Sequence, residues 1–292
     1  MSTPADPKPV YELYRYTPSL EAAAIFAALF AGTTIVHIYQ LVKTKAWYFT
    51  PFVVGGVFEI IGYIARIKAH SNTKSVPIYS IQTILILLAP ALFAASIYIV
   101  LGRLIVALGA ERLSPIRVKW MTKIFVCGDV IAFLGQAVGG GVMASGTLSA
   151  LSTGEHITVA GLCVQLLFFS VFIFVATIFH RRFNDSAAAA TMRVPTKYMF
   201  RNRNWETVLY VLYTTSALIL VRSAFRVIEF AMGNDGELLS HEAYAYIFDS
   251  TLMFLAMVTL NLFHPSSVLG AKVASGSAIG MNLTSISERD SA

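Results

Sequence analysis

Charged side chains are scarce in this chain. Asp, Glu, Lys and Arg make up 13% of its 292 residues, while the AVILMFWYC set reaches 56%. An ordinary soluble domain carries roughly 25% charged residues, about twice as many. So few charges cannot cover the surface of a water-soluble fold of this length. The composition excludes a disordered chain, argues against a soluble enzyme, and predicts a membrane protein.

Cysteine-based motifs and catalytic motifs are also missing. Cys127 and Cys163 both lie within apolar stretches, which argues against a disulfide framework or a Cys-based metal site. Residues 1–18 show no charged-then-apolar signal pattern, so the first spanning helix is expected to direct insertion. There is no Walker A loop, no GxSxG elbow and no GxGxxG after a strand, so we expect no ATPase activity. The net charge of +6 comes without a basic, aromatic-interleaved patch on a polar domain, so we expect no nucleic-acid partner.

The chain instead has apolar stretches of about 20 residues, the length that crosses a bilayer. Seven such stretches cover Leu20–Val42, Trp47–Ile67, Ile78–Arg103, Val118–Ser145, His156–His180, Trp205–Met232 and Ala243–His264. Polar or Gly- and Pro-containing segments separate them, including Ser149 to Gly154 before the fifth stretch. We predict an all-α, polytopic membrane protein whose seven-transmembrane helix bundle spans residues 19–266. Residues 267–292 are expected to form a disordered tail.

The distribution of Lys and Arg predicts the orientation, because cytoplasmic segments are enriched in both. One side of the predicted bundle carries Lys43, Lys45, Arg112, Arg117, Lys119, Lys123, Arg181, Arg182, Arg193, Lys197, Arg201, Arg203, Lys272 and Arg289. The other side carries only Lys8, Arg15, Lys68 and Lys74. The N-terminus, with the tail 1–18, is therefore expected outside and the C-terminus in the cytoplasm. Trp47, Trp120 and Trp205 fall at predicted cytoplasmic helix ends, where indoles anchor at the interface.

Eight ionisable residues lie inside the predicted spans, where each costs about 2.5–3.5 kcal/mol on insertion scales. They are Glu59, Asp129, Glu229 and Asp249 against Arg66, Arg103, Arg222 and Arg226. Equal numbers of the two signs predict a neutral polar centre whose charges pair internally. Counting 1.5 Å per residue along each helix places Glu59 and Asp129 near mid-membrane and most of the others in the outer half.

These residues recur at helical spacing, so they share faces. Glu59, Gly62, Tyr63 and Arg66 form one stripe of the second span, and Arg222, Arg226 and Glu229 form one on the sixth. Turned inward, such stripes are predicted to enclose a polar chamber in the outer half of the membrane. The predicted ligand-binding or translocation residues are Glu59, Tyr63, Arg66, Tyr98, Asp129, Gln136, Gln165, Arg222, Arg226, Glu229 and Asp249. The alternative is that the charges only pair helix to helix. The Gly135-xxx-Gly139 spacing predicts close helix packing.

Several ordered motifs resemble one family. The segment Glu59–Arg66 has the form E-x-x-G-Y-x-x-R, which resembles the fungal RTA-like family of lipid-translocating exporters. The resemblance continues through Leu88 to Arg103, Asp129 to Gly141, Ala160 to Gln165, Arg222 to Phe230, Glu242 to Asp249 and His264-Pro265. It covers roughly residues 18–266, which leaves only the tails outside.

Members of that family are implicated in the release of sphingoid long-chain bases, in resistance to toxic amphiphiles and in porphyrin uptake. The resemblance implies a non-enzymatic, multi-pass protein of the plasma membrane, with an endomembrane location as the alternative. It implies binding and export of an amphiphilic lipid such as a sphingoid base, with membrane lipids or amphiphilic small molecules as partners and no cofactor. Transport without a nucleotide site is downhill or ion-coupled, and Glu59 and Asp129 are the expected proton carriers if it is coupled.

Other functions remain open at this point. An amphiphile-sensing receptor would signal through the basic segment Arg181–Arg203, and porphyrin or haem-related uptake is possible within the same family. An intramembrane lipid hydrolase would need a metal or a nucleophile. His37, His180 and His264 lie on three helices without an HxxxH or HExxH pattern, so we expect no metal site.

The orientation has a direct test. The sequons at Asn184 and Asn282 both fall on the predicted cytoplasmic side, so we expect neither to be glycosylated. Endoglycosidase treatment of the expressed protein should leave its electrophoretic mobility unchanged. A mobility shift that is lost on substitution of either Asn would place that side of the bundle outside.

Overall fold

The structure is a computed structural model that describes residues 17–73, 75–143, 148–186, 205–232 and 241–266. The predicted cytoplasmic tail 267–292 and residues 1–16 of the predicted extracellular tail lie outside the described residues, as does Asn282. Within the described residues all regular structure is helical.

In the described part of the chain, seven helical spans are long and apolar enough to cross a membrane. In chain order the helices are α1 (Leu20–Thr44), η1 (Trp47–Phe49), α2 (Thr50–Ser71), α3 (Val76–Ala107), η2 (Glu111–Leu113), α4 (Val118–Met143), α5 (Leu148–Asn184), α7 (Trp205–Ala231), α9 (Glu242–Ala245), η4 (Tyr246–Ser250) and α10 (Thr251–Leu262). The seventh span is made of α9, η4 and α10 together. The predicted all-α, seven-span bundle is confirmed.

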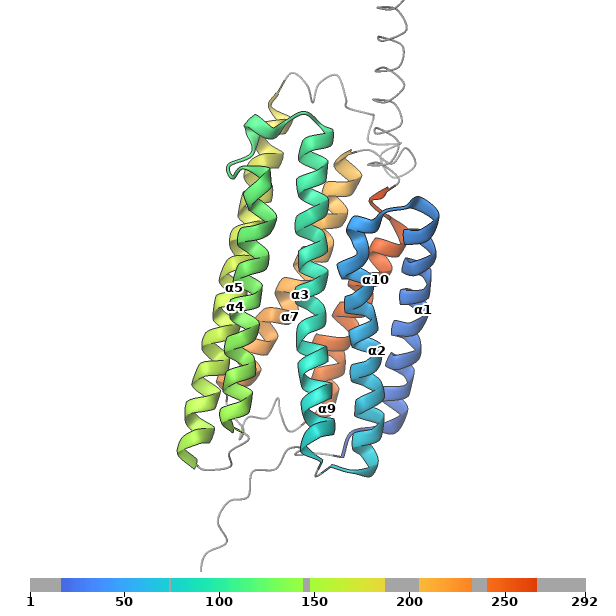
Figure 1. Cartoon of the computed structure of the whole chain (residues 1–292), viewed down its shortest axis with the longest axis vertical. Coiled ribbons are helices and arrows are strands. Elements are labelled where there is room, and N and C mark those ends of the chain that lie inside the picture. Colours follow the sequence, from blue (N-terminus) through green and yellow to red (C-terminus); the bar gives the residue numbers. More distant parts are fainter. Residues whose placement is uncertain (1–16, 74, 144–147, 187–204, 233–240, 267–292) are drawn as a thin grey trace, which may run out of the picture.

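The spans run along the long axis of the molecule in three groups (Figure 1). Helices α4 and α5 lie on one side, α1, α2 and α10 lie on the other, and α3 and α7 lie between them. Buried aromatic rings fill the interior, as where Phe52 of α2 and Phe93 of α3 lie 4.5 Å apart. Large apolar side chains also cover the outside, with Ile35, Phe174 and Leu262 each more than 60% exposed. An apolar exterior of this extent suits contact with lipid rather than water.

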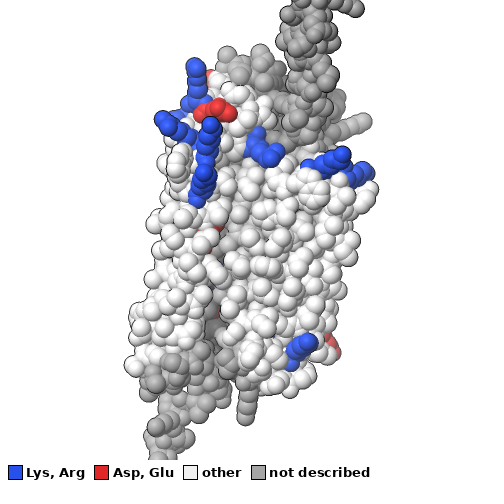
Figure 2. Space-filling view, viewed as in Figure 1, with Lys and Arg blue, Asp and Glu red and all other residues white. Residues whose placement is uncertain are grey.

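The two ends of the bundle differ in charge. Lys and Arg gather at the upper end in Figure 2 and are sparse at the lower end. We call the upper end, which carries Lys43, Lys45 and Lys119, the basic end, and the opposite one the Glu242 end. That the basic end faces the cytoplasm stays a prediction. Trp47 and Trp120 are exposed there as expected, but Trp205 is buried against Phe183, 4.9 Å between rings, so it is no interfacial anchor.

Glycine brings α4 and α5 into close contact, as the Gly135-xxx-Gly139 spacing predicts. A Cβ atom on Gly139 would lie 2.7 Å from both the carbonyl oxygen of Gly154 and the amide nitrogen of Thr158. A Cβ atom on Gly161 would lie 2.8 Å from the carbonyl oxygen of Ala132. Backbone atoms this close leave no room for a side chain, so the two helices pack as a tight pair.

The start of α5 corrects the sequence-based prediction. Ser149 to Gly154 was expected to break the chain before the fifth span, yet α5 already begins at Leu148. The hydroxyl of Thr153 donates to the Ser149 carbonyl at 2.8 Å, a bond that small polar residues make within helices. Gly154 is needed for the close approach to α4 and does not end a helix here.

The seventh span contains a π-helical turn that the sequence did not predict. In η4 the Thr251 hydroxyl donates to the Tyr246 carbonyl at 2.8 Å, and the Ser250 hydroxyl donates to the Ala245 carbonyl at 3.4 Å. Both bonds reach five residues back, so they satisfy carbonyl groups that the wider turn displaces. Single π turns within α-helices occur frequently at functional sites.

The α4–α5 contact yields a paired test. Gly139→Ala should lower the stability by about 1–3 kcal/mol, because the new methyl group has no space against α5. Gly140 is exposed with no atom within 4 Å of its position for a Cβ, so Gly140→Ala should leave stability unchanged or raise it slightly. Thermal unfolding of both variants in detergent measures the difference. Equal melting temperatures would mean that α4 and α5 are not packed this closely.

Candidate functional site

The eleven residues predicted as the site all turn toward the interior. Ten of them are buried, and Arg226 is half-buried. Glu59 is 1% exposed and Arg222 is 2% exposed, although each carries a group that ionises in water. The prediction that the polar stripes face inward is therefore confirmed.

The structure divides ten of these residues between two groups, and the eleventh, Arg66, pairs elsewhere, with Glu242. The arginine network lies on α2, α7 and η4 and consists of Glu59, Tyr63, Arg222, Arg226, Glu229 and Asp249. The Asp129 cluster lies on α3, α4 and α5 and consists of Tyr98, Asp129, Gln136 and Gln165. The division follows from the helix order, because α3 packs between α2 and α4. Whether a ligand chamber forms at either group stays a prediction.

Arg222 is the centre of the arginine network. Its Nε donates to Asp249 of η4, and its Nη2 donates to the Ile86 carbonyl of α3 at 3.2 Å. Arg226, one turn further along α7, pairs with Glu229 at 2.7 Å and approaches the second oxygen of Asp249 at 3.9 Å. One acid on the seventh span is thus held by two guanidinium groups of α7, which is the arrangement that makes a buried charge tolerable.

Glu59 adds a third carboxyl group to this network. The charged side chains that act on it are Asp249 and Arg222, and its Oε1 is buried without a hydrogen-bond partner. Tyr63, one turn along α2, shares a hydrogen bond with Ser250 of η4. The network therefore holds three carboxyl groups against two guanidinium groups, which leaves one negative charge unpaired if all three ionise.

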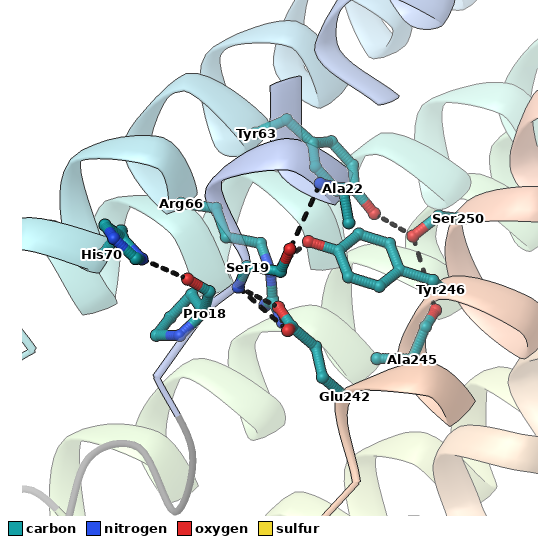
Figure 3. Close-up of polar contacts among 10 residues, drawn as sticks. All are labelled: Pro18, Ser19, Ala22, Tyr63, Arg66, His70, Glu242, Ala245, Tyr246 and Ser250. Atoms are coloured by element: carbon teal, nitrogen blue, oxygen red, sulfur yellow. Dashed lines mark hydrogen bonds and ion pairs between the residues drawn. The ribbon is translucent and has the colours of Figure 1, made fainter. Parts of the chain in front are cut away.

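A latch of polar contacts joins three chain segments at the Glu242 end (Figure 3). Arg66 of α2 donates from Nη2 to Glu242 at 2.8 Å and from Nε to the Tyr246 hydroxyl at 3.1 Å. The same carboxylate accepts the backbone amide of Ser19 at 2.9 and 3.0 Å, while His70 Nδ1 lies 2.7 Å from the Pro18 carbonyl. The latch ties the start of α1 to α2 and to the seventh span.

The Asp129 cluster is built differently, since its one acid is bonded to a tyrosine that packs among aromatic rings. The Tyr98 hydroxyl donates to Asp129 Oδ2 at 2.9 Å, and the Tyr98 ring lies 4.5 Å from Phe172 and 5.4 Å from Phe125. Nearer the Glu242 end, Gln136 Nε2 donates to Gln165 Oε1 at 3.0 Å and joins α4 to α5.

The predicted neutral balance of buried charges is wrong. Arg66 pairs with Glu242, an acid assigned to the outer side by sequence, and Arg103 is exposed with its guanidinium 4.2 Å over the Tyr48 ring. Within the described residues, two guanidinium groups therefore remain for the four buried acids of the spans. A buried carboxyl group without a cation neutralises itself by binding a proton.

Sequence reasoning missed two contributors on the seventh span, Glu242 and Ser250, and placed Tyr246 on its inward stripe without naming it as a site residue. Glu242, Tyr246 and Ser250 each bond to a predicted site residue of α2. The E-x-x-x-Y-x-x-D spacing was the available signal, because it places Glu242 and Tyr246 on one helix face. Ser250 joins them only because η4 winds as a π turn, which no sequence pattern revealed.

The histidines do not form a common site. His37 and His264 lie 6.4 Å apart beside Phe49, whereas His180 packs against Tyr213 and Trp205. Across the described ranges, no group of three or more His, Cys, Asp or Glu residues is arranged to hold a metal ion.

The Arg222–Asp249 pair yields a double-mutant test of the network. Arg222→Gln should lower stability by about 3–5 kcal/mol, because it leaves Asp249 as a buried charge with a weakened partner. The double variant Arg222→Gln/Asp249→Asn removes both charges and should recover much of that loss. Thermal unfolding of the two variants and the parent protein measures the coupling. Additive losses would show that the pair does not interact in the folded protein.

Comparison with known proteins gives a consistent family. Residues 52–272 match the family described as RTA1 like protein. Protein RTM1 of Saccharomyces cerevisiae is 37% identical over 85% of this chain and 90% of its own length. Protoporphyrin uptake protein 1 of the same species is 33% identical over 86% of this chain and 91% of its length.

A third relative is named as a transporter of a sphingoid base. Sphingoid long-chain base transporter RSB1 of Saccharomyces cerevisiae is 29% identical over 85% of this chain and 76% of its length. No solved structure matches the chain. The family match covers most of the residues that build the bundle and both polar groups. The chain is a multi-pass membrane protein and belongs to the RTA1-like family.

Proposed function

We propose that this protein binds an amphiphilic lipid with an amine head group, such as a sphingoid long-chain base, and translocates it across the plasma membrane. Export of such a compound would protect the cell from toxic amphiphiles. The observation that carries the proposal is an excess of buried carboxyl groups over guanidinium groups inside a membrane-spanning bundle.

The names of the relatives support this substrate class. One is named as a sphingoid long-chain base transporter and another as a protoporphyrin uptake protein. Both names describe movement of an amphiphilic molecule and not its chemical conversion. A sphingoid base has an ammonium group at neutral pH and a long apolar chain, so its head suits a carboxylate and its tail suits the lipid.

The charges of the site favour an amine over an acid as the head group. Arg222 and Arg226 already bond to Asp249 and Glu229, so neither is held ready for an anionic group. The carboxyl groups of Glu59 and Asp129 each keep one buried oxygen without a hydrogen-bond partner. An ammonium group donates three hydrogen bonds and would satisfy such oxygens.

Porphyrin uptake is the second candidate, because the relative named for it is more similar to this chain than RSB1 is. A porphyrin carries carboxylates, which would have to displace Asp249 from Arg222 or Glu229 from Arg226. A receptor-like sensor is the third, and it would bind the amphiphile without moving it.

Transport in liposomes tests the proposal. The reconstituted protein should move a fluorescent sphingoid base between leaflets, and Glu59→Gln and Asp129→Asn should each reduce the rate about tenfold or more. A hydrogen bond to a charged group contributes about 1.5–3 kcal/mol, and a free-energy difference of about 1.4 kcal/mol corresponds to a factor of ten in the affinity on which the rate depends. Glu21→Gln, an exposed change at the start of α1, is the matched control.

Three outcomes separate the candidates. Loss of flux in both variants with intact folding and a normal control supports amine transport. Flux of protoporphyrin but not of the sphingoid base would move the assignment to the second candidate. Saturable binding with no flux of either compound would favour the sensor and contradict transport.

A further inference from the structure

We propose that Asp129 is the residue that binds the ammonium group of the amphiphile, and that each bound ammonium displaces one proton from its carboxyl group. This inference rests on the proposed function and makes it more specific. It names the acid that receives the head group, the path by which the head group arrives and the ion that is exchanged for it.

Asp129 is a buried acid with one hydrogen bond and an open position. Its side chain lies in α4 and is 3% exposed. Oδ2 accepts the Tyr98 hydroxyl at 2.9 Å, while Oδ1 is buried without a hydrogen-bond partner. A polar oxygen in this position costs free energy unless a donor reaches it. Oδ1 can therefore accept a hydrogen bond from an added donor. A donor that is also a cation would balance the charge of the carboxylate as well.

No charged side chain of the elements around Asp129 offsets its charge. On α3 the titratable groups are Tyr79, Tyr98 and Arg103, and only Tyr98 contacts the acid, since Arg103 is exposed over Tyr48. On α5 the charged residues are Glu155, Arg181 and Arg182, which lie near the two ends of that helix.

The charged residues of α4 and Arg222 of α7 do not offset the charge of Asp129 either. On α4 itself, Lys119 and Lys123 lie in the first turns at the basic end. Arg222 of α7 is bonded to Asp249. An ionised Asp129 would thus be an unpaired charge at low dielectric, so in the absence of ligand the carboxyl group holds a proton.

Aromatic rings provide the second half of an ammonium site. Phe125, Phe169 and Phe172 lie 5.4, 6.1 and 4.5 Å from the Tyr98 ring, centre to centre, and all are buried. Aromatic faces attract organic ammonium ions, and the attraction is stronger where water is excluded. A carboxylate among aromatic rings is the combination that recognises such ions, whereas a metal ion would need several oxygen ligands.

The packing of α4 suggests how a lipid arrives. Glycine contacts hold α4 tightly on α5, and its packing on α3 is less extensive. Figure 2 shows a furrow along the seam between the α4–α5 pair and α3, with acidic atoms visible inside it. Val130, Ile131 and Leu134 of α4 are exposed and apolar, so an alkyl chain can remain in the lipid while its head group enters the seam.

The other buried acids are less suited to this role. Asp249 is bonded to Arg222, and Glu229 is bonded to Arg226. Within the described residues neither Glu59 nor Asp129 forms an ion pair, and each keeps one buried oxygen without a hydrogen-bond partner. Of these two, Asp129 is the one that accepts a hydroxyl from a tyrosine packed among other aromatic rings.

The exchange balances in charge and in protons. A protonated carboxyl group and an ammonium ion become an ammonium carboxylate pair, and the proton leaves to water. No covalent bond of the amphiphile forms or breaks. Since the site carries no net charge before or after, one cation has replaced another, and movement of the amine in one direction is linked to movement of a proton in the other.

Calorimetry of the intact protein in lipid nanodiscs tests the exchange. Sphingosine is titrated at one pH in two buffers of different ionisation enthalpy, with empty nanodiscs as the reference for partitioning. The difference in heat should correspond to about one proton released per sphingosine bound. Asp129→Asn should release no proton and bind sphingosine at least about tenfold more weakly, and Glu21→Gln should behave as the parent protein.

A second variant guards against misfolding of the first. Tyr98→Phe keeps the acid and removes only its hydrogen-bond donor, so it should still release one proton while binding sphingosine more weakly. In ceramide the nitrogen of the same long-chain base is acylated by a fatty acid and carries no charge, so ceramide should release no proton with any variant.

The results distinguish this inference from the function on which it rests. Sphingosine binding by the parent protein without proton release, or proton release that persists in Asp129→Asn, overturns the role of Asp129 and leaves amine transport standing. Release that is lost only in Glu59→Gln moves the site to the arginine network. No saturable binding by the parent protein overturns the proposed function as well.

Discussion

The fold depends on the burial of Arg222. Its guanidinium group bonds to Asp249 on the seventh span and to the Ile86 carbonyl on α3, so one side chain of α7 joins three spans. In a membrane the apolar faces of helices gain little by leaving lipid, so directed polar contacts have a larger share in fixing which helices are neighbours. Removing this guanidinium would leave Asp249 with Arg226 at 3.9 Å, too far for a strong hydrogen bond.

The charges of the two polar groups are arranged differently. In the arginine network two of the three carboxyl groups have a guanidinium partner, and the Arg222–Asp249 and Tyr63–Ser250 contacts join α7 and α2 to the seventh span. At Asp129 the partner is a neutral phenol within a ring of aromatics, so the acid is stable only while it is neutral or has a cation from elsewhere. The two groups therefore differ in how far the protein itself balances the charge of their buried acids.

Sequence alone predicted the parts of this protein that depend on composition and periodicity. Seven spans, the inward stripes of α2 and α7 and the glycine contact of α4 follow from apolar length, 3.6-residue spacing and the absence of a side chain. What the sequence did not predict depends on which residues and helices become neighbours in the folded structure. Arg66 pairs with Glu242 and not with a mid-membrane acid, Ser149 to Gly154 stay helical because α4 covers Gly154, and α3 divides the polar residues into two groups.

The π turn η4 gives the seventh span two possible registers. A π turn holds one residue more than an α turn, so its conversion to α would rotate the residues on one side by about 100°. Asp249 and Ser250 lie within that turn, whereas Glu242 is fixed before it by Arg66 and by the Ser19 amide. With the helix start held in place, rewinding the turn would swing Asp249 away from Arg222 and release Tyr63 from Ser250. A change of one residue in winding would therefore break the contacts of the seventh span with Arg222 and Tyr63, while its contact with Arg66 at Glu242 stays in place.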